Sequence, residues 1–167
     1  LLGHWWFEGP DWLEALMRRA ARPESGVELL SPGDYLERLP TRQTLEPVPS
    51  SWGQGGYNET WLNGSNDWVY RHLHHLADRM VTQATAHRDA QGLTRRLLNQ
   101  MARELLLAQA SDWAFILKAQ THTAYAYRRL RDHLARFTAL DHALTRGQVD
   151  ETLLRSCEAQ DPLFPSL

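Results

Sequence analysis

Tryptophan is the residue type whose number and position most directly suggest a ligand in this 167-residue chain, which contains seven tryptophans. Five of them are expected in loops or at the starts of elements, outside apolar helical stripes: Trp5, Trp6, Trp52, Trp61 and Trp68. Polar groups lie between or beside them: His4, Glu8, Asn66 and Asp67. This combination suits a sugar ring, whose C–H face packs on an indole while its hydroxyls bond to carboxylates and amides. Composition alone equally allows an aromatic interface between two parts of the chain.

The histidines offer a weaker candidate site. The segment RHLHH places His72 and His75 three residues apart on one helical face, a spacing that can hold zinc. A zinc site needs further ligands, and the sequence has neither a neighbouring cysteine nor an HExxH motif. We therefore expect no metal and no cofactor, and interpret these histidines as surface or packing residues. The glycine-rich segment GQGGYN lacks the order of a phosphate-binding loop.

Composition limits the partners and the compartment. Eighteen Lys and Arg against twenty Asp and Glu give a net charge of −2 without a concentrated basic tract, so no nucleic-acid partner is expected. No apolar run approaches the ~20 residues of a membrane span. The single cysteine, Cys157, cannot form an intrachain disulfide, which favours a reducing, cytoplasmic location. Because Leu1 is not an initiator methionine, we expect the chain to be part of a longer gene product.

The first 45 residues have an alternating α/β pattern. Pro10 and Asp11 indicate a helix start, followed by an apolar stripe at helical spacing: Trp12, Leu13, Leu16, Met17 and Ala20. The β-branched start and apolar character of Val27–Leu30 predict a short buried strand. Ser31 and Pro32 then predict the N-cap and first residue of a second short helix, SPGDYLERL.

The pattern changes after Pro40. Residues 40–65 are rich in proline and glycine and show no helical period, which predicts an unusually long and therefore functional loop. From Asn66 onward the sequence predicts a helical bundle with breaks near Gly92, Ser111, Thr121 and Gly147. The expected bundle core comprises Leu97, Leu98, Met101, Leu105, Leu106, Trp113, Tyr127, Leu130, Leu134 and Phe137.

Several motifs in order along nearly the whole chain resemble those of one enzyme family. They are LLGHWWFEGPDWLE, GVELLSPGDYL, SSWGQGG, WLNGSNDWVYRHLH and RELLLAQASDWAFI. The chain resembles the C-terminal portion of glycoside hydrolase family 57, specifically its prokaryotic 1,4-α-glucan branching enzymes. Leu2 is a small departure, because the family commonly has phenylalanine there.

The resemblance implies a mainly α fold: a helical C-terminal domain preceded by the last strand and helix elements of a catalytic (β/α)7 barrel. Residues 1–45 would end the barrel, residues 46–65 would form a long loop at the cleft, and residues 66–167 would form the helical domain. The family's catalytic glutamate and aspartate would both lie upstream of Leu1, and Glu8 is neither of them.

The implied function is that of the C-terminal part of a retaining transglycosylase that forms α-1,6 branches, inactive alone. The resemblance places His4, Trp5 and Trp6 beside the catalytic aspartate and Trp52 in the glucan-binding cleft; Trp61, Asp67 and Trp68 complete the candidate substrate-binding set. The expected partners are an α-glucan such as amylose or glycogen and the upstream barrel. Two alternatives stay open: a non-catalytic interaction or stability domain, and part of a family 57 4-α-glucanotransferase or amylase.

Overall fold

The structure, a computed structural model, describes residues 8–41 and 43–165 of the chain. The chain divides into two compact units, Leu1–Val48 and Pro49–Leu167. The described residues form helices and irregular connections without a β-strand, which confirms the mainly α prediction. Among these residues, no helix has both the length and the apolar character that crossing a lipid bilayer requires.

The first unit contains two of the predicted helices. Helix α1 spans Glu8–Ala20, a 3-10 turn spans Pro23–Ser25, and α2 spans Pro32–Arg38. The start of α2 is as predicted, because the Ser31 hydroxyl accepts a hydrogen bond from the Asp34 backbone N–H at 3.1 Å. This bond satisfies one of the amide groups that the first turn of a helix leaves without an intrahelical partner.

The strand predicted at Val27–Leu30 is wrong for this structure. The segment has no regular secondary structure, and no described segment pairs with it. A β-strand is stabilised by hydrogen bonds to a neighbouring strand, so a β-branched, apolar run indicates a strand only where a second strand is available. Val27 is instead 58% exposed.

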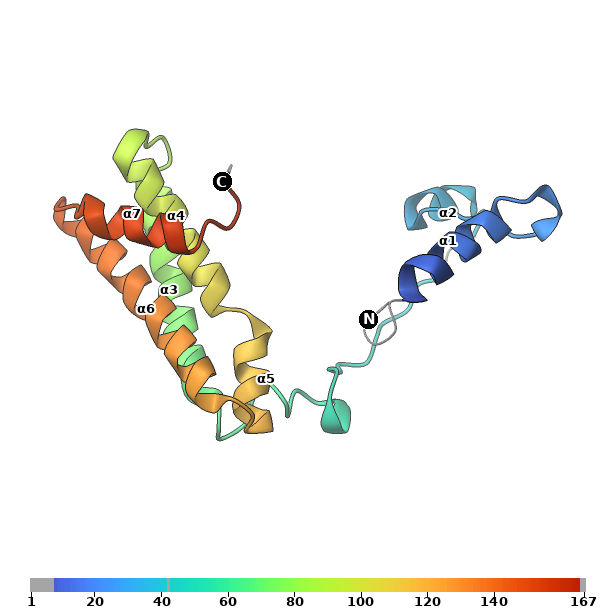
Figure 1. Cartoon of the computed structure of the whole chain (residues 1–167), viewed down its shortest axis with the longest axis horizontal. Helices are drawn as coiled ribbons and strands as arrows, with labels where there is room; N and C mark the ends of the chain where they lie inside the picture. The colour runs from blue at the N-terminus through green and yellow to red at the C-terminus, as the bar shows by residue number, and fades with distance from the viewer. Residues whose placement is uncertain (1–7, 42, 166–167) are drawn as a thin grey trace. The chain divides into compact units, whose positions relative to one another are not determined.

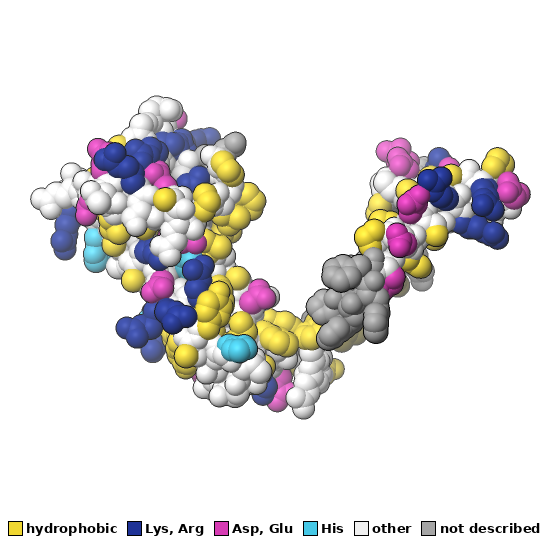
Figure 2. All heavy atoms as spheres, in the orientation of Figure 1, with side chains coloured by type: hydrophobic (Ala, Val, Ile, Leu, Met, Phe, Trp, Pro, Cys, Tyr) yellow, Lys and Arg dark blue, Asp and Glu magenta, His cyan; other side chains and the backbone are white. Residues whose placement is uncertain are grey.

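The apolar residues of the first unit remain largely uncovered. The predicted stripe on α1 exists, but Trp12, Leu13, Leu16 and Met17 are all exposed. Figure 2 shows hydrophobic side chains at the surface of this unit among the charged ones. An amphipathic helix gains most of its stability by burying its apolar face, so this unit lacks the usual source of helix stability.

The second unit contains the predicted helical bundle. Its helices are α3 (Asp67–Ala86), α4 (Gly92–Ala108), α5 (Ser111–Ala119), α6 (Thr123–Arg146) and α7 (Glu151–Gln160). Helices α3, α4 and α6 contact one another along their lengths, as Figure 1 shows, and α7 packs against α4. The long loop predicted before the bundle is also present, and in its described residues the one helical element is a 3-10 turn at Gln54–Gly56.

The helix breaks have simple local causes. Gly147 ends α6 with a positive φ of 65°, a left-handed conformation that glycine adopts at little cost. The next helix begins at Asp150, whose Oδ1 accepts hydrogen bonds from the backbone N–H groups of Thr152 and Leu153 at 2.9 and 3.1 Å. These two signals turn the chain and start α7.

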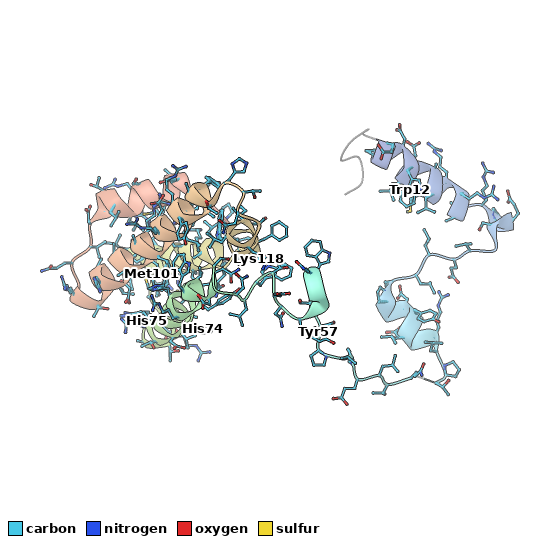
Figure 3. The ribbon with its side chains drawn as sticks, turned by 90° about the horizontal axis from the view of Figure 1, so that it is seen from below. Trp12, Tyr57, His74, His75, Met101 and Lys118 are labelled. Carbon is cyan, nitrogen blue, oxygen red and sulfur yellow. The ribbon has the colours of Figure 1, made fainter. Side chains whose placement is uncertain are left out.

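The bundle core lies between α3, α4, α5, α6 and α7. Six of the ten predicted core residues are buried: Leu97, Leu98, Met101, Leu105, Leu130 and Phe137. Figure 3 labels Met101, which lies among the packed helices. Trp113 and Leu134 are partly buried against this core. Two assignments are wrong, because Leu106 is 44% and Tyr127 42% exposed.

A buried polar network ties the C-terminal segment to α4 and α6. His133 Nδ1 lies 2.7 Å from Glu104 Oε2, and both side chains are fully buried. Arg136 donates to Asp161 at 2.7 Å, and Arg103 donates to the carbonyl oxygens of Leu163 and Phe164. Buried polar groups are costly unless paired, so these contacts fix one position for the segment after α7.

Candidate functional site

Three aromatic side chains gather where the long loop meets α5. The Trp52 ring centroid lies 5.9 Å from that of Trp61 at an interplanar angle of 64°, and 6.0 Å from that of Phe115 at 43°. We call Trp52, Trp61 and Phe115 the aromatic cluster. Trp52 is 73% exposed and Phe115 40% exposed, so the cluster presents ring surface to solvent. Exposed aromatic groups of this kind stack on flat or ring-shaped ligands.

The loop that carries Trp52 is held by its own backbone. The Ser51 N–H donates to the Gly56 carbonyl oxygen, and the Asn58 N–H donates to the Ser51 hydroxyl, both at 2.6 Å. Gly53 has a φ of 99°, and a Cβ at that position would overlap the Thr60 hydroxyl. The close approach of Thr60 therefore requires glycine at position 53, directly after Trp52.

A side chain of α3 forms a hydrogen bond with the backbone of Trp61. The Tyr70 hydroxyl donates a hydrogen bond to the Trp61 carbonyl oxygen, and burial raises the pKa of Tyr70, so this hydroxyl stays protonated as a donor. A cavity of about 330 Å³ adjoins these two residues and is lined by Asn58, Trp61, Leu62, Tyr70 and His74. The cavity mixes aromatic faces with amide and imidazole groups, the chemistry of a polar, ring-shaped ligand.

Phe115 was not among the sequence-predicted site residues. It lies on α5, whose sequence WAFIL is apolar on every side, so hydrophobic periodicity cannot distinguish a core-facing position from a surface one. The one feature of the sequence that could have pointed to Phe115 is its position two residues after Trp113 in the SDWAF segment. The contact with Trp52 shows which face of α5 is turned toward the loop.

Trp68 lies in the first turn of α3 and makes different contacts from the two loop tryptophans, Trp52 and Trp61. Its ring stacks on Tyr127 with centroids 5.3 Å apart and planes 8° from parallel, and it meets His72 edge to face at 6.1 Å. Trp68 and His72 line an open groove of about 670 Å³ between α3 and α6, together with Arg131 and His142. The structure thus brings together Trp52 and Trp61 but gives Trp68 a separate setting.

The remaining predicted site residues are either exposed or not described. Asp67 is exposed in the first turn of α3, where a negative charge favours the helix. His4, Trp5 and Trp6 lie outside the described residues.

One group of potential metal ligands occurs among the described residues, and it differs from the histidine pair weighed in the sequence. It comprises Glu104, His133 and Asp161, all buried. Glu104 Oε2 lies 2.7 Å from His133 Nδ1 and Asp161 accepts from Arg136, whereas the buried His133 Nε2 has no hydrogen-bond partner among the described residues. A cationic Arg136 next to both carboxylates supplies the positive charge that a metal would bring.

The chain thus contains a helical bundle domain with an exposed aromatic cluster where the preceding loop meets α5. The sequence profile of the family described as "1,4-alpha-glucan branching enzyme, C-terminal" matches residues 72–167. The chain belongs to this family, as the resemblance predicted.

Individual relatives agree with this assignment. The chain is 35% identical over 169 residues to the 1,4-alpha-glucan branching enzyme TK1436 of Thermococcus kodakarensis, covering 98% of this chain and 25% of the relative. It is 30% identical over 176 residues to the probable 1,4-alpha-glucan branching enzyme Rv3031 of Mycobacterium tuberculosis, covering 100% and 33%. The chain therefore spans about a quarter to a third of the length of these relatives.

Solved structures show the same fold over almost the whole chain. The GH57-type branching enzyme of Pyrococcus horikoshii matches with a TM-score of 0.79 and 35% identity, covering 99% of this chain and 32% of that one. The α-amylase AmyC of Thermotoga maritima matches with a TM-score of 0.73 and 37% identity, covering 99% and 30%.

Proposed function

We propose that this chain acts as the C-terminal part of a retaining 1,4-α-glucan branching enzyme and supplies aromatic binding surface to an α-glucan such as amylose or glycogen. The observation that carries the proposal is the exposed Trp52 of the aromatic cluster, in a chain of the branching-enzyme C-terminal family. An exposed indole held by neighbouring rings is a preformed stacking surface for the C–H face of a glucose unit.

We assign residues 1–45 to the end of the catalytic barrel, 46–65 to the cleft loop and 66–167 to the helical domain. The uncovered apolar residues of the first unit support the first assignment, because Trp12 and Met17 would be buried against the rest of a barrel.

The proposed reaction needs carboxyl groups that this chain does not supply. A retaining double displacement uses two carboxyl groups ~5–5.5 Å apart that flank the scissile bond. We place both upstream of Leu1, with His4, Trp5 and Trp6 beside the aspartate. The chain's own residues would bind and orient the glucan rather than transfer protons or form the covalent intermediate.

The aromatic surface has a specific task in branching. The covalent intermediate must be intercepted by a 6-hydroxyl group of a glucan and not by water. A wall formed by Trp52 and Trp61 would orient the acceptor chain and exclude solvent from the intermediate. Trp68 and Asp67 extend the proposed glucan-binding set along the start of α3.

The proposed partners are the α-glucan and the upstream barrel, without nucleic acid, membrane, metal or cofactor. We also propose a cytoplasmic location. The free, buried thiol of Cys157 supports it, because a reducing compartment preserves an unpaired cysteine.

The isolated chain is predicted to have neither transglycosylase nor hydrolase activity. An iodine-stain assay and a reducing-end assay on amylose measure both. Activity that disappears in Glu8→Gln or Asp67→Asn would contradict the placement of the catalytic groups upstream.

Replacing Trp52 by alanine in the full-length enzyme is predicted to impair branching far more than folding. Loss of one desolvated stacking surface is worth on the order of 1 kcal/mol or more in the transition state, hence a roughly fivefold or greater fall in kcat/KM. The ratio of branching to hydrolysis should also fall, because water gains access to the intermediate. Tyr57→Ala is the matched control, since Tyr57, labelled in Figure 3, lies on the same loop and is 74% exposed beside 73% for Trp52. A destabilised Trp52→Ala enzyme with the parental product ratio would contradict the cleft assignment.

A further inference from the structure

Asn66 occupies a position that usually has another role. It is the N-cap residue of α3, where an asparagine normally accepts a hydrogen bond from a backbone N–H of the first helical turn. Here the side chain makes no such capping bond. Asn66 is nevertheless fully buried, so its carboxamide must find other partners.

All the bonds of this carboxamide point away from α3. Its Oδ1 accepts from the Asn63 backbone N–H at 2.9 Å. Its Nδ2 donates to two carbonyl oxygens, those of Thr60 and Ala114, each at 3.0 Å. Asn66 and Ala114 are 48 residues apart, so the nitrogen joins segments that are distant in sequence.

The two carbonyl groups are the ones that precede the aromatic residues. The Thr60 carbonyl belongs to the peptide bond that leads into Trp61, and the Ala114 carbonyl belongs to the one that leads into Phe115. Trp61 and Phe115 are also the two rings that contact Trp52. One NH₂ group thus holds the backbone next to each of the two rings that contact Trp52.

We propose that Asn66 is the positioning residue of the aromatic cluster: its NH₂ group bridges the peptide groups before Trp61 and Phe115 and thereby sets the spacing that a glucan meets. The glucan part of this proposal rests on the proposed function. Asparagine alone among residues of its size offers an acceptor and two donors on one planar group. Aspartate keeps the acceptor toward Asn63 but turns an oxygen toward two carbonyl oxygens, which repels both.

The chain supplies a matched control in Gln83, the other buried carboxamide that makes two side-chain donor bonds. Gln83 Nε2 donates to Asp141 Oδ1 at 2.6 Å and to Thr145 Oγ1 at 2.9 Å, far along α3 from the loop. Gln83→Glu therefore makes the same amide-to-acid change and destabilises the bundle without touching the aromatic cluster.

The test measures the binding of maltoheptaose by tryptophan fluorescence in the 167-residue chain and in its Asn66→Asp, Asn66→Ala and Gln83→Glu variants. We expect Asn66→Asp and Asn66→Ala to raise the Kd at least fivefold, and Gln83→Glu to leave it unchanged at a comparable loss of Tm. Asn66→Asp removes the two donor bonds to Thr60 and Ala114 but keeps the acceptor bond to the Asn63 N–H. A folded Asn66→Asp variant that binds with the parental Kd would overturn the proposal.

Amide hydrogen exchange gives a readout that needs no glucan. We expect exchange at residues 60–63 and 114–116 to rise at least tenfold in Asn66→Asp but not in Gln83→Glu. If the parental chain fails to bind maltoheptaose, the proposed function fails, while the exchange rates still decide whether Asn66 positions the cluster. Unchanged exchange, or complete unfolding of both Asn66 variants beside a folded Gln83→Glu, would overturn the local positioning role.

Discussion

Both units of the chain contain helices with apolar residues at helical spacing, but these side chains are exposed in the first unit and buried in the second. In the first unit, α1 exposes Trp12 and Met17, whereas in the second, α4 and α6 bury Met101 and Phe137 almost completely. Both sets follow helical spacing in the sequence. The difference shows that an apolar stripe specifies a surface that needs a partner, and that only the second unit contains its own partner.

Separating the units should give the largest effect. We expect a fragment of residues 49–167 to unfold cooperatively and to keep the helical circular dichroism of its five helices, because its core is internal. A fragment of residues 1–48 should show little helix in water, since isolated helices of this length are marginal. A cooperative melting transition in the short fragment would break the comparison.

Substitutions of apolar residues should lower the free energy of unfolding more in the second unit than in the first, with a smaller effect than separating the units. Phe137 is 1% exposed, so Phe137→Ala is expected to cost about 3–5 kcal/mol in the free energy of unfolding. Leu16→Ala, on the exposed face of α1, should cost less than about 1 kcal/mol in the isolated chain. Urea titration of both variants measures these costs, and equal costs would show that α1 is covered in solution.

The pH dependence of stability should arise chiefly in the bundle. Burial alone would raise the pKa of Asp141, but hydrogen bonds from Arg79 and Gln83 and the charge of Arg79 outweigh it and hold this pKa below its usual value. A carboxyl group with a lowered pKa contributes stability above its unfolded-state pKa of about 3.9, and this stability disappears as the pH falls through the folded-state value.

Asp141→Asn is therefore expected to lower the Tm by a few degrees at pH 7 and to reduce the loss of Tm between pH 5 and pH 2. The ion pairs of the first unit, Arg18–Glu14 and Arg38–Glu28, are exposed and should contribute little. Glu28→Gln serves as the matched control, and its melting curves should follow those of the parent at every pH. An Asp141→Asn variant with the parental pH profile would contradict the assignment.

Much of the fold could be predicted from local signals. The Ser31 cap, the long loop and the bundle helices follow from capping residues, glycine and proline positions, and helical period. The exposed Leu106 was misassigned because it directly follows Leu105 on α4, and consecutive positions on a helix point about 100° apart. Tyr127 has core spacing on α6 but stacks on Trp68 at the edge of the bundle.

The candidate site was less predictable. Trp52 and Trp61 were identified because aromatic residues in a loop lack a core to fill, and the structure brings their rings together. Phe115 and Asn66 could not be identified in this way, since their roles depend on contacts between the loop and α5. The sequence places Asn66 only at the start of the helical region and beside the tryptophans, and only the tertiary structure shows that its side chain bridges two other segments.

The reactivity of the buried Cys157 thiol can be used to measure how often α7 separates from the bundle. It is the chain's single thiol, it lies on α7, and burial raises its pKa, so a thiol reagent can modify it only when α7 separates from the bundle. The labelling rate consequently counts these separations without an added dye or an engineered cysteine. Comparing that rate with the rate of global unfolding would reveal whether the last helix detaches by itself or only together with the whole bundle.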